Sequence, residues 1–238
     1  FLCGDNDLLS TVKIPRLSII FYGIDNQSAN ICGTIESSTP LSTQFSISWK
    51  GKRWQAAIPG AGRHLVLNAL AAFGVGVTMG LEPEEAIAAL RDYVPAGMRQ
   101  KVVEHHGVTV IEDCYNASPD SMAAALATLG SFPAAGKKIF VASDMLELGE
   151  IACQCHRQAG EKAAQSGADI LLACGELARE MVEAAREAGM ADARFFPEKK
   201  ELSAALVQMA RPGDLIWFKG SRCMKLEEVV EDLYASLK

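Results

Sequence analysis

The sequence predicts an α/β protein built of two domains, and three observations indicate this. Residues 17–58 are rich in β-branched and aromatic residues, residues 64–93 carry two helical patterns, and the remainder alternates short apolar runs with helical patterns. Such alternation with short connections is typical of a mainly parallel sheet covered by helices on both faces. Pro95-Ala96-Gly97 breaks the last helix of the first part, so we expect one domain over residues 1–96 and a Rossmann-like domain over residues 97–238.

The first domain is expected to contain a β-hairpin followed by two helices. Its elements, in chain order, are strands at residues 44–49 and 54–58 and helices at residues 64–79 and 82–93. Lys50-Gly51-Lys52 is typical of a turn between paired strands. Gly80 stands where a helix C-cap is expected. Pro83, with acidic neighbours, is typical of the first turn of a helix.

The second domain is expected to alternate regularly. Its strands are predicted at residues 108–111, 138–142, 170–173, weakly at 194–196, and at 214–218, and its helices at residues 119–129, 153–166, 176–188, 200–210 and 225–237. His105-His106 lies beside Gly107 between two apparent strands, which favours an exposed hairpin turn.

Composition excludes several classes of partner. The net charge is −6 and no basic run is longer than a few residues, so we expect no nucleic-acid partner. No apolar run reaches the roughly 20 residues that span a bilayer, and no signal peptide is recognisable.

Seven cysteines scattered over the chain are typical of reduced thiols in the cytoplasm. We expect a cytoplasmic monomer. Because the chain opens on Phe1, we also expect it to be truncated.

Polar residues follow three of the predicted strands. They occupy residues 112–122 after the first strand, residues 143–149 after the second and Lys219-Gly220-Ser221-Arg222 after the last. Ligands of open parallel sheets bind outside the carboxyl ends of the strands, so we expect the three clusters to form one site. Each cluster also has a structural explanation. Ser118 or Asp120 would cap a helix, residues 144–149 would form an ordinary loop, and residues 219–222 would form a solvated basic turn.

Four segments together resemble one known family. They are Glu112-Asp113-Cys114-Tyr115-Asn116-Ala117-Ser118-Pro119-Asp120-Ser121-Met122, then Ser143-Asp144-Met145-Leu146-Glu147-Leu148-Gly149 followed by His156, then Lys219-Gly220-Ser221-Arg222, and upstream Gly62-Arg63-His64 with Asn68-Ala69-Leu70-Ala71-Ala72. Their order and wording resemble the Mur ligases. The Tyr115-Asn116 pair is typical of the branch that adds D-alanyl-D-alanine to the UDP-N-acetylmuramoyl-tripeptide precursor of peptidoglycan.

The resemblance implies a nucleotide site for ATP. Asn68 would contact the adenine, since a carboxamide offers both a donor and an acceptor to a base edge. The alternative is that Asn68 satisfies a buried helix junction. Arg99 would reach a phosphate and take part in catalysis, and Asp113 would accept hydrogen bonds from ribose hydroxyls.

The resemblance also implies a site for the incoming dipeptide and the developing acyl phosphate. Its residues would be Tyr115, Asn116, Asp144, Lys219, Ser221 and Arg222. Lys219 is expected to be catalytic, and Lys219 and Arg222 would pair with the terminal carboxylate of the dipeptide. Cys114, Ser118 and Ser143 depart from the family pattern, which has serine, asparagine and glycine there.

No Gly-x-x-x-x-Gly-Lys-Ser/Thr occurs in the 238 residues. The resemblance implies that the phosphate loop, the Mg²⁺ ligands and the domain that binds the UDP-sugar peptide lie upstream. We therefore expect residues 1–96 to be the end of a central ATPase domain, no metal ligand in this chain, and no activity of the chain alone. The alternatives are a sister Mur ligase or polyglutamate synthetase, a non-catalytic nucleotide-binding or interaction module, and a truncated paralogue.

Overall fold

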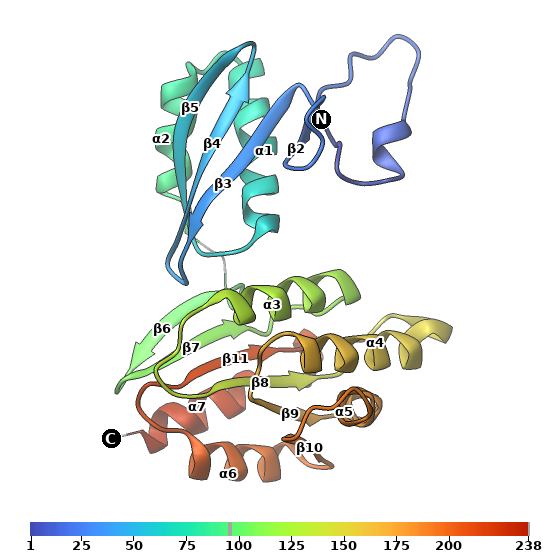
Figure 1. Cartoon of the computed structure of the whole chain (residues 1–238), viewed down its shortest axis with the longest axis vertical. Helices are drawn as coiled ribbons and strands as arrows, with labels where there is room; N and C mark the ends of the chain where they lie inside the picture. The colour runs from blue at the N-terminus through green and yellow to red at the C-terminus, as the bar shows by residue number, and fades with distance from the viewer. Residues whose placement is uncertain (95–96, 238) are drawn as a thin grey trace. The chain divides into compact units, whose positions relative to one another are not determined.

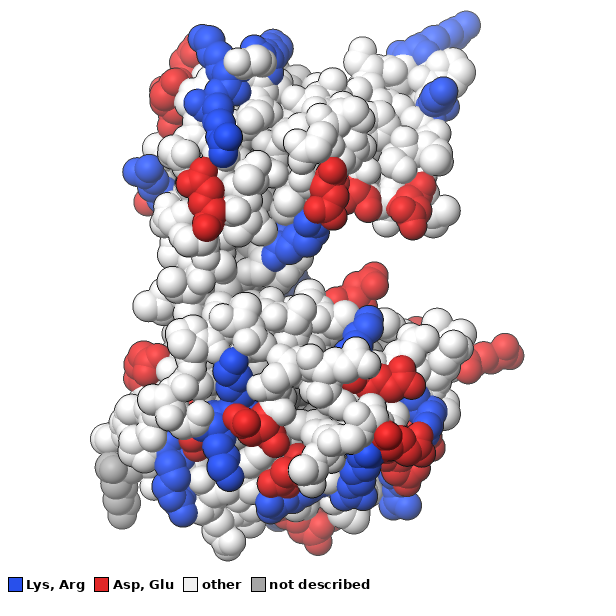
Figure 2. Space-filling view, in the orientation of Figure 1, with Lys and Arg blue, Asp and Glu red and all other residues white. Residues whose placement is uncertain are grey.

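The computed structural model describes residues 1–94 and 97–237, which fold as two compact units, Phe1–Val94 and Pro95–Lys238 (Figure 1). The predicted break at Pro95-Ala96-Gly97 begins at the boundary of the units, and its first two residues lie outside the described residues. Among the described residues, no helix combines the length and apolar character needed to cross a membrane. Figure 2 shows acidic and basic side chains interspersed on the visible face of the second unit.

The first unit is a five-stranded sheet with two helices. Its elements are β1 (Leu2–Cys3), the 3₁₀ turn η1 (Leu9–Thr11), β2 (Phe21–Gly23), β3 (Ile31–Ser38), β4 (Ser42–Trp49), β5 (Lys52–Pro59), α1 (Arg63–Thr78) and α2 (Pro83–Arg91). The strands lie in sequence order; β1, β2 and β3 are parallel, and β3, β4 and β5 antiparallel. The predicted hairpin and both helices are confirmed. Lys50 and Gly51 both have positive φ, the conformation that suits the twist of a two-residue hairpin.

Local sequence explains how these elements begin and pack. Pro83 opens α2 behind a capping box between Glu82 and Glu85, which satisfies backbone N–H groups at the helix start. Phe73 of α1 packs against Trp49 edge-on, with ring centroids 5.9 Å apart. The first unit therefore has a core of its own.

The second unit is a six-stranded sheet with helices on both faces. Its strands are β6 (Lys101–His105), β7 (Val108–Asp113), β8 (Lys138–Ser143), β9 (Ile170–Cys174), β10 (Ala193–Phe196) and β11 (Leu215–Lys219). Its helical elements are α3 (Pro119–Ser131), η2 (Gly149–Ile151), α4 (Ala152–Gln165), α5 (Ala178–Glu187), α6 (Lys199–Met209), η3 (Arg222–Met224) and α7 (Glu227–Ser236). The expected Rossmann-like alternation is confirmed. The predicted hairpin turn is confirmed too, with positive φ at His106 and Gly107.

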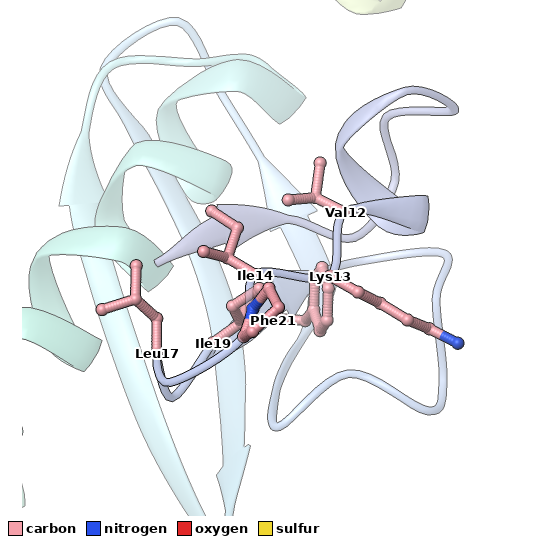
Figure 3. A pocket seen from close by; sticks show the side chains of 7 residues that line it. Val12, Lys13, Ile14, Leu17, Ile19 and Phe21 are labelled. Atoms are coloured by element: carbon pink, nitrogen blue, oxygen red, sulfur yellow. The ribbon is translucent and has the colours of Figure 1, made fainter.

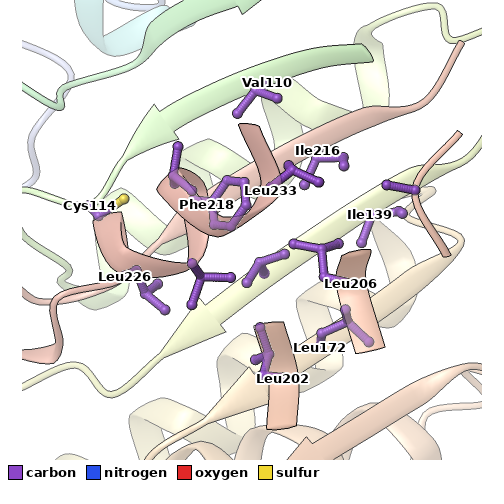
Figure 4. Close-up of a cluster of buried hydrophobic side chains, with 14 of the residues drawn as sticks. Val110, Cys114, Ile139, Leu172, Leu202, Leu206, Ile216, Phe218, Leu226 and Leu233 are labelled. Atoms are coloured by element: carbon purple, nitrogen blue, oxygen red, sulfur yellow. The ribbon is translucent and has the colours of Figure 1, made fainter. Parts of the chain in front are cut away.

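Alternate residues of the strands fill two cores. Ile139, Leu172, Ile216 and Phe218 point toward α6 and α7, where they meet side chains such as Leu206 (Figure 4). On the opposite face, Trp217 stacks on Phe132 at the end of α3, with ring centroids 6.4 Å apart. Both faces of the central strands are thus buried, as their nearly continuous apolar sequences require.

The strand order is β10-β9-β8-β11-β7-β6, with only β6 antiparallel to its neighbour. The last strand, β11, therefore enters between the first two parallel strands, β7 and β8. Its end, Lys219, is in register with Asp113 of β7 and Ala142 of β8. This insertion brings the three polar clusters to adjacent strand ends.

Candidate functional site

Three neighbouring strands, β7, β11 and β8, end at the same edge of the second sheet. Their last residues are Asp113, Lys219 and Ser143, and the loops that follow contain all three polar clusters. The predicted convergence of these clusters is confirmed. We refer to the loops at residues 114–118, 144–149 and 220–222 as the carboxyl-edge loops.

Lys219 lies at the end of β11, the middle one of these three strands. Its Nζ lies 2.9 Å from Oδ2 of Asp113 and donates a 3.0 Å hydrogen bond to the carbonyl of Asn116. Lys219 is only 2% exposed, and the Asp113 side chain only 11%. A buried charge pair of this kind is tolerated only when both members are paired and hydrogen-bonded. Lys219 therefore fixes the loop after β7 to β11, with its charge already compensated by Asp113.

The loop after β7 contains both buried residues with a structural role and residues exposed to solvent. Burial, together with the charges of Asp113 and Glu227, raises the pKa of the Cys114 thiol to about 12, so the thiol stays protonated and is a poor nucleophile. Tyr115 and Asn116 are exposed. Ser118 caps α3, since its Oγ accepts the N–H of Ser121, so the helix-cap explanation is correct for that residue.

Arg99 stacks on the ring of Tyr115. The guanidinium carbon lies 4.2 Å from the ring centroid, within the range of a cation–π interaction. The backbone N–H of Tyr115 also donates to the carbonyl of Met98, at 3.2 Å. Two predicted residues that are 16 positions apart are thereby brought together at the edge of the sheet.

Asp144 is directed into the protein. Its carboxylate accepts the backbone N–H groups of Glu176, Leu177 and Ala178, at 3.0, 3.1 and 2.8 Å. Gly175 makes room for it, because a Cβ there would lie 2.3 Å from Oδ1 of Asp144. Both carboxylate oxygens are thus used to cap the start of α5. In this arrangement Asp144 organises the edge and does not face outward, unlike the orientation expected from the sequence.

His156, for which the sequence motif suggested no role, supports the same loop. It is completely buried. Its Nδ1 lies 2.7 Å from the Ala152 carbonyl, and its Nε2 accepts the N–H of Met145 at 2.9 Å. These partners require the neutral ring protonated on Nδ1. The 4.0 Å separation between Nε2 and the Asp144 carboxylate is consequently not an ion pair.

Ser221 connects two of the carboxyl-edge loops through hydrogen bonds. Its Oγ accepts the N–H of Leu146 at 3.0 Å, and its own N–H donates to the Asp144 carbonyl at 3.2 Å. Arg222 differs, because it is exposed and pairs with Glu227 at 2.6 Å. Exposed ion pairs of this type contribute about 0–1 kcal/mol, so the pair costs little to break.

Asn68 belongs to the first unit, on α1. It is exposed, and its side-chain amide forms no hydrogen bond within residues 1–94 and 97–237. The alternative of a buried helix junction is therefore wrong. An exposed, unpaired amide keeps its donors and acceptor for a ligand.

The sequence interpretation gave Glu112 no role of its own and did not single out Tyr234. Glu112 is buried and accepts a hydrogen bond from the Tyr234 hydroxyl at 2.8 Å, while Lys101 lies 3.3 Å away. Burial and this carboxylate raise the pKa of Tyr234 well above its usual value. No local signal links Glu112 to Tyr234, because the contact spans 122 positions.

Metal-ligand geometry and a hollow on the surface of the first unit also bear on ligand binding along the described residues. Within residues 1–94 and 97–237, no three His, Cys, Asp or Glu side chains could hold a metal ion together. An open hollow of about 400 Å³ lies in the first unit, lined by Val12, Lys13, Ile14, Pro15, Leu17, Ile19 and Phe21 (Figure 3). Its lining is almost wholly apolar and contains none of the predicted site residues.

Comparison with known proteins agrees with this geometry. The family described as "Mur ligase, glutamate ligase domain" matches residues 98–222, a span that contains all three carboxyl-edge loops. The chain belongs to the Mur ligase family. Among curated Mur ligases, the UDP-N-acetylmuramoyl-tripeptide--D-alanyl-D-alanine ligase of Bacillus subtilis (strain 168) is 39% identical over 202 residues, which cover 84% of this chain and 44% of that enzyme.

Solved Mur ligases have the same fold. MurF from Acinetobacter baumannii superposes with a TM-score of 0.80 at 26% identity, over 91% of this chain and 46% of that one. MurF ligase from Thermotoga maritima, solved in complex with ADP, gives a TM-score of 0.81 at 24% identity, over 99% and 52%. The chain thus spans about half the length of the Mur ligases it matches.

One departure from the Mur ligase motif has a visible consequence. Ser143 stands where the family pattern has glycine, and its Oγ is buried without a hydrogen-bond partner among the described residues. A Cβ at Gly220 would lie 1.9 Å from that oxygen. A side chain at position 220 would therefore require the Ser143 hydroxyl to rotate away.

Proposed function

We propose that this chain is the part of an ATP-dependent ligase that binds nucleotide and D-alanyl-D-alanine and joins the dipeptide to UDP-N-acetylmuramoyl-tripeptide. The observation that carries the proposal is the Asp113–Lys219–Asn116 arrangement, which joins the Tyr115-Asn116 motif to the Lys-Gly-Ser-Arg motif. The relative in Bacillus subtilis, named for this reaction, supports the choice of substrate. Residues 1–96 would be the end of the ATPase domain, and residues 97–238 the ligase domain.

The nucleotide is proposed to contact three residues. Asn68 has an exposed, unpaired amide for the adenine edge, and Arg99 has an exposed guanidinium for a phosphate. Asp113 would accept the ribose hydroxyls, although its Oδ2 is already held by Lys219. The MurF neighbour solved with ADP supports nucleotide binding. Mg²⁺ is proposed as the second cofactor, held by residues in the part of the related ligases that this chain does not span.

The dipeptide and acyl phosphate are proposed to meet the carboxyl-edge loops. In the expected reaction, ATP phosphorylates the substrate carboxylate, the dipeptide amine attacks the acyl carbon, and phosphate leaves. Arg222 would release Glu227 and pair with the terminal carboxylate of the dipeptide. Asn116 would offer its exposed side-chain amide to the substrate. Lys219 would not contact the substrate itself but would hold the Asn116 backbone in position. Such a site accelerates the reaction by holding the reacting groups in place.

Asp144 and Ser221 would contribute through loop geometry. Both are buried, and their hydrogen bonds tie the loops after β8 and β11 to each other and to α5. The cytoplasmic location and the monomeric state remain predictions.

A chimera tests the proposal. The part of the Bacillus subtilis relative that this chain does not span would be joined to the 238 residues, and phosphate release would be measured with ATP and the UDP-linked tripeptide. We expect release to require D-alanyl-D-alanine. Asp113→Asn should abolish it, whereas Asp192→Asn, which removes only a surface pair with Arg194, should not. The 238 residues alone should release none, since they lack a phosphate loop.

Three outcomes would contradict the proposal. Release that depends on a single amino acid instead of the dipeptide would indicate a sister ligase. Nucleotide binding without turnover in a folded chimera would indicate a binding module. Dipeptide-dependent release by the 238 residues alone would show that the phosphate loop is not needed.

A further inference from the structure

We propose that Tyr115 is a positioning residue whose ring holds the Arg99 guanidinium ready for a phosphate group. The proposal rests on the proposed function and assigns to Tyr115 a role different from dipeptide contact. Its first basis is the stacking geometry, with the guanidinium carbon of Arg99 4.2 Å from the ring centroid. Its second basis is that no acidic side chain of the described residues forms an ion pair with Arg99.

The backbone brings the two side chains together. In the β6–β7 hairpin, Lys101 pairs with Glu112, and the same register continued outward would pair Met98 with Tyr115. The 3.2 Å hydrogen bond from the Tyr115 N–H to the Met98 carbonyl matches that extension. Met98 packs against the hydrophobic core that α7 also joins, so the segment before β6 is anchored. Arg99, the next residue, is consequently held beside the ring.

Stacking leaves the binding groups of the guanidinium available. A guanidinium carries five N–H donors that lie in its plane, whereas an aromatic ring contacts its face. A carboxylate partner would use those donors; Tyr115 does not. Since a free arginine side chain loses much rotamer freedom on binding, an arginine already held in place binds an anion more tightly.

The surroundings favour an anion at this point. Arg99 is exposed and Tyr115 is 46% exposed, so the edge of the guanidinium is open to solvent. Asp113, which lies two residues before Tyr115, is paired with Lys219 at 2.9 Å. The ligand class is therefore a phosphate or polyphosphate, and the contact uses the edge of Arg99.

The test uses the 238-residue chain and tripolyphosphate as the probe. Binding would be followed by NMR on the Nε–Hε signal of Arg99, assigned by its loss in Arg99→Lys. We expect Tyr115→Leu to weaken binding about two- to fivefold, the range of an exposed cation–π contact. Tyr115→Phe keeps the ring and should bind like the parent chain. Tyr93→Leu, at an exposed tyrosine of the first unit, is the matched control and should have no effect.

Two readouts separate stacking from a general structural role. The ring-current shift of the Arg99 side-chain protons should persist in Tyr115→Phe and vanish in Tyr115→Leu. In an Arg99→Lys background the Nε–Hε signal is absent, so tripolyphosphate binding is measured there, and in the parent chain, by titration calorimetry. Lysine cannot stack a planar group on the ring, so Tyr115→Leu should weaken binding less in that background than in the parent chain. Equal loss in Tyr115→Phe and Tyr115→Leu would assign the effect to the hydroxyl and overturn the proposal. Unchanged binding in Tyr115→Leu would also overturn it.

In the chimera, Tyr115→Leu should raise the KM for ATP by a similar factor and leave the KM for the dipeptide unchanged. A rise confined to the dipeptide KM would return Tyr115 to a substrate contact. Failure of the ligase proposal is distinguishable, because an inactive chimera leaves the tripolyphosphate and ring-current results intact. An active chimera without coupling between residues 99 and 115 would refute only the positioning role.

Discussion

Asp144→Asn is expected to destabilise the second unit substantially. Asp144 is 5% exposed, and its carboxylate accepts three backbone N–H groups at the start of α5, at 2.8 to 3.1 Å. Asparagine has nearly the same shape, so the replacement leaves no cavity. It does exchange one acceptor oxygen for an NH₂ group that faces the N–H groups of the helix.

The magnitude follows from these contacts. One buried N–H left without an acceptor costs about 1–3 kcal/mol. Loss of the negative charge beside the N-terminus of α5 removes about 1 kcal/mol of interaction with the helix dipole. Together they give about 2–4 kcal/mol at neutral pH. With a urea m-value of about 2 kcal/mol/M, the unfolding midpoint should fall by about 1–2 M.

The assay can report on the second unit alone. The chain has three tryptophans, and only Trp217 lies in that unit, fully buried in its core. In a Trp49→Phe/Trp54→Phe background, urea unfolding followed by fluorescence therefore measures the second unit. Asp192→Asn is the matched control, since it removes one surface carboxylate and should shift stability by no more than about 1 kcal/mol.

A midpoint for Asp144→Asn within the range of the control would refute this reasoning. It would mean that the three N–H groups find water or other partners at no net loss. If the same variant lost ligase activity in the chimera while keeping its stability, Asp144 would have to contact substrate directly.

Two further predictions concern titration and thiol reactivity. Burial raises the pKa of Asp5, but three backbone N–H groups and Arg63 outweigh it and hold the pKa below its usual value. Stability from a depressed carboxyl pKa is lost as the pH falls through the folded value. The free energy of unfolding of the first unit should thus fall below about pH 4. In urea unfolding across an acid pH series, Asp5→Asn should make this free energy depend less on pH. The same pH dependence in Asp5→Asn and the parent chain would contradict the prediction. A thiol reagent at pH 8 should label the exposed Cys153 and Cys223 quickly and Cys114 only after denaturation; rapid labelling of Cys114 in the folded chain would contradict its burial.

The sequence by itself predicted the alternation of the second unit, the hairpin and two helices of the first, and the residues of the candidate site; β2 and β3 were not predicted as separate strands. Apolar runs such as residues 138–142 and 214–218 predicted buried strands, and they are β8 and β11. Lys50-Gly51 predicted a turn because few conformations suit a two-residue connection. These signals are local, since periodicity records which side of an element is buried. The motifs after the strand ends were also readable, because parallel strands expose their carboxyl ends at one edge.

Only the tertiary structure decided which side chains face outward. The insertion of β11 between β7 and β8 places Lys219 against Asp113, 106 positions earlier. The lysine expected to pair with the dipeptide carboxylate is therefore buried beside a carboxylate of its own chain. Asp144 meets amides of α5 more than 30 positions away, whereas Asn68 and Arg99 remain exposed. A polar residue has the same local sequence whether it binds a ligand or satisfies its own protein. Its role depends on the groups packed against it, and those come from distant parts of the chain.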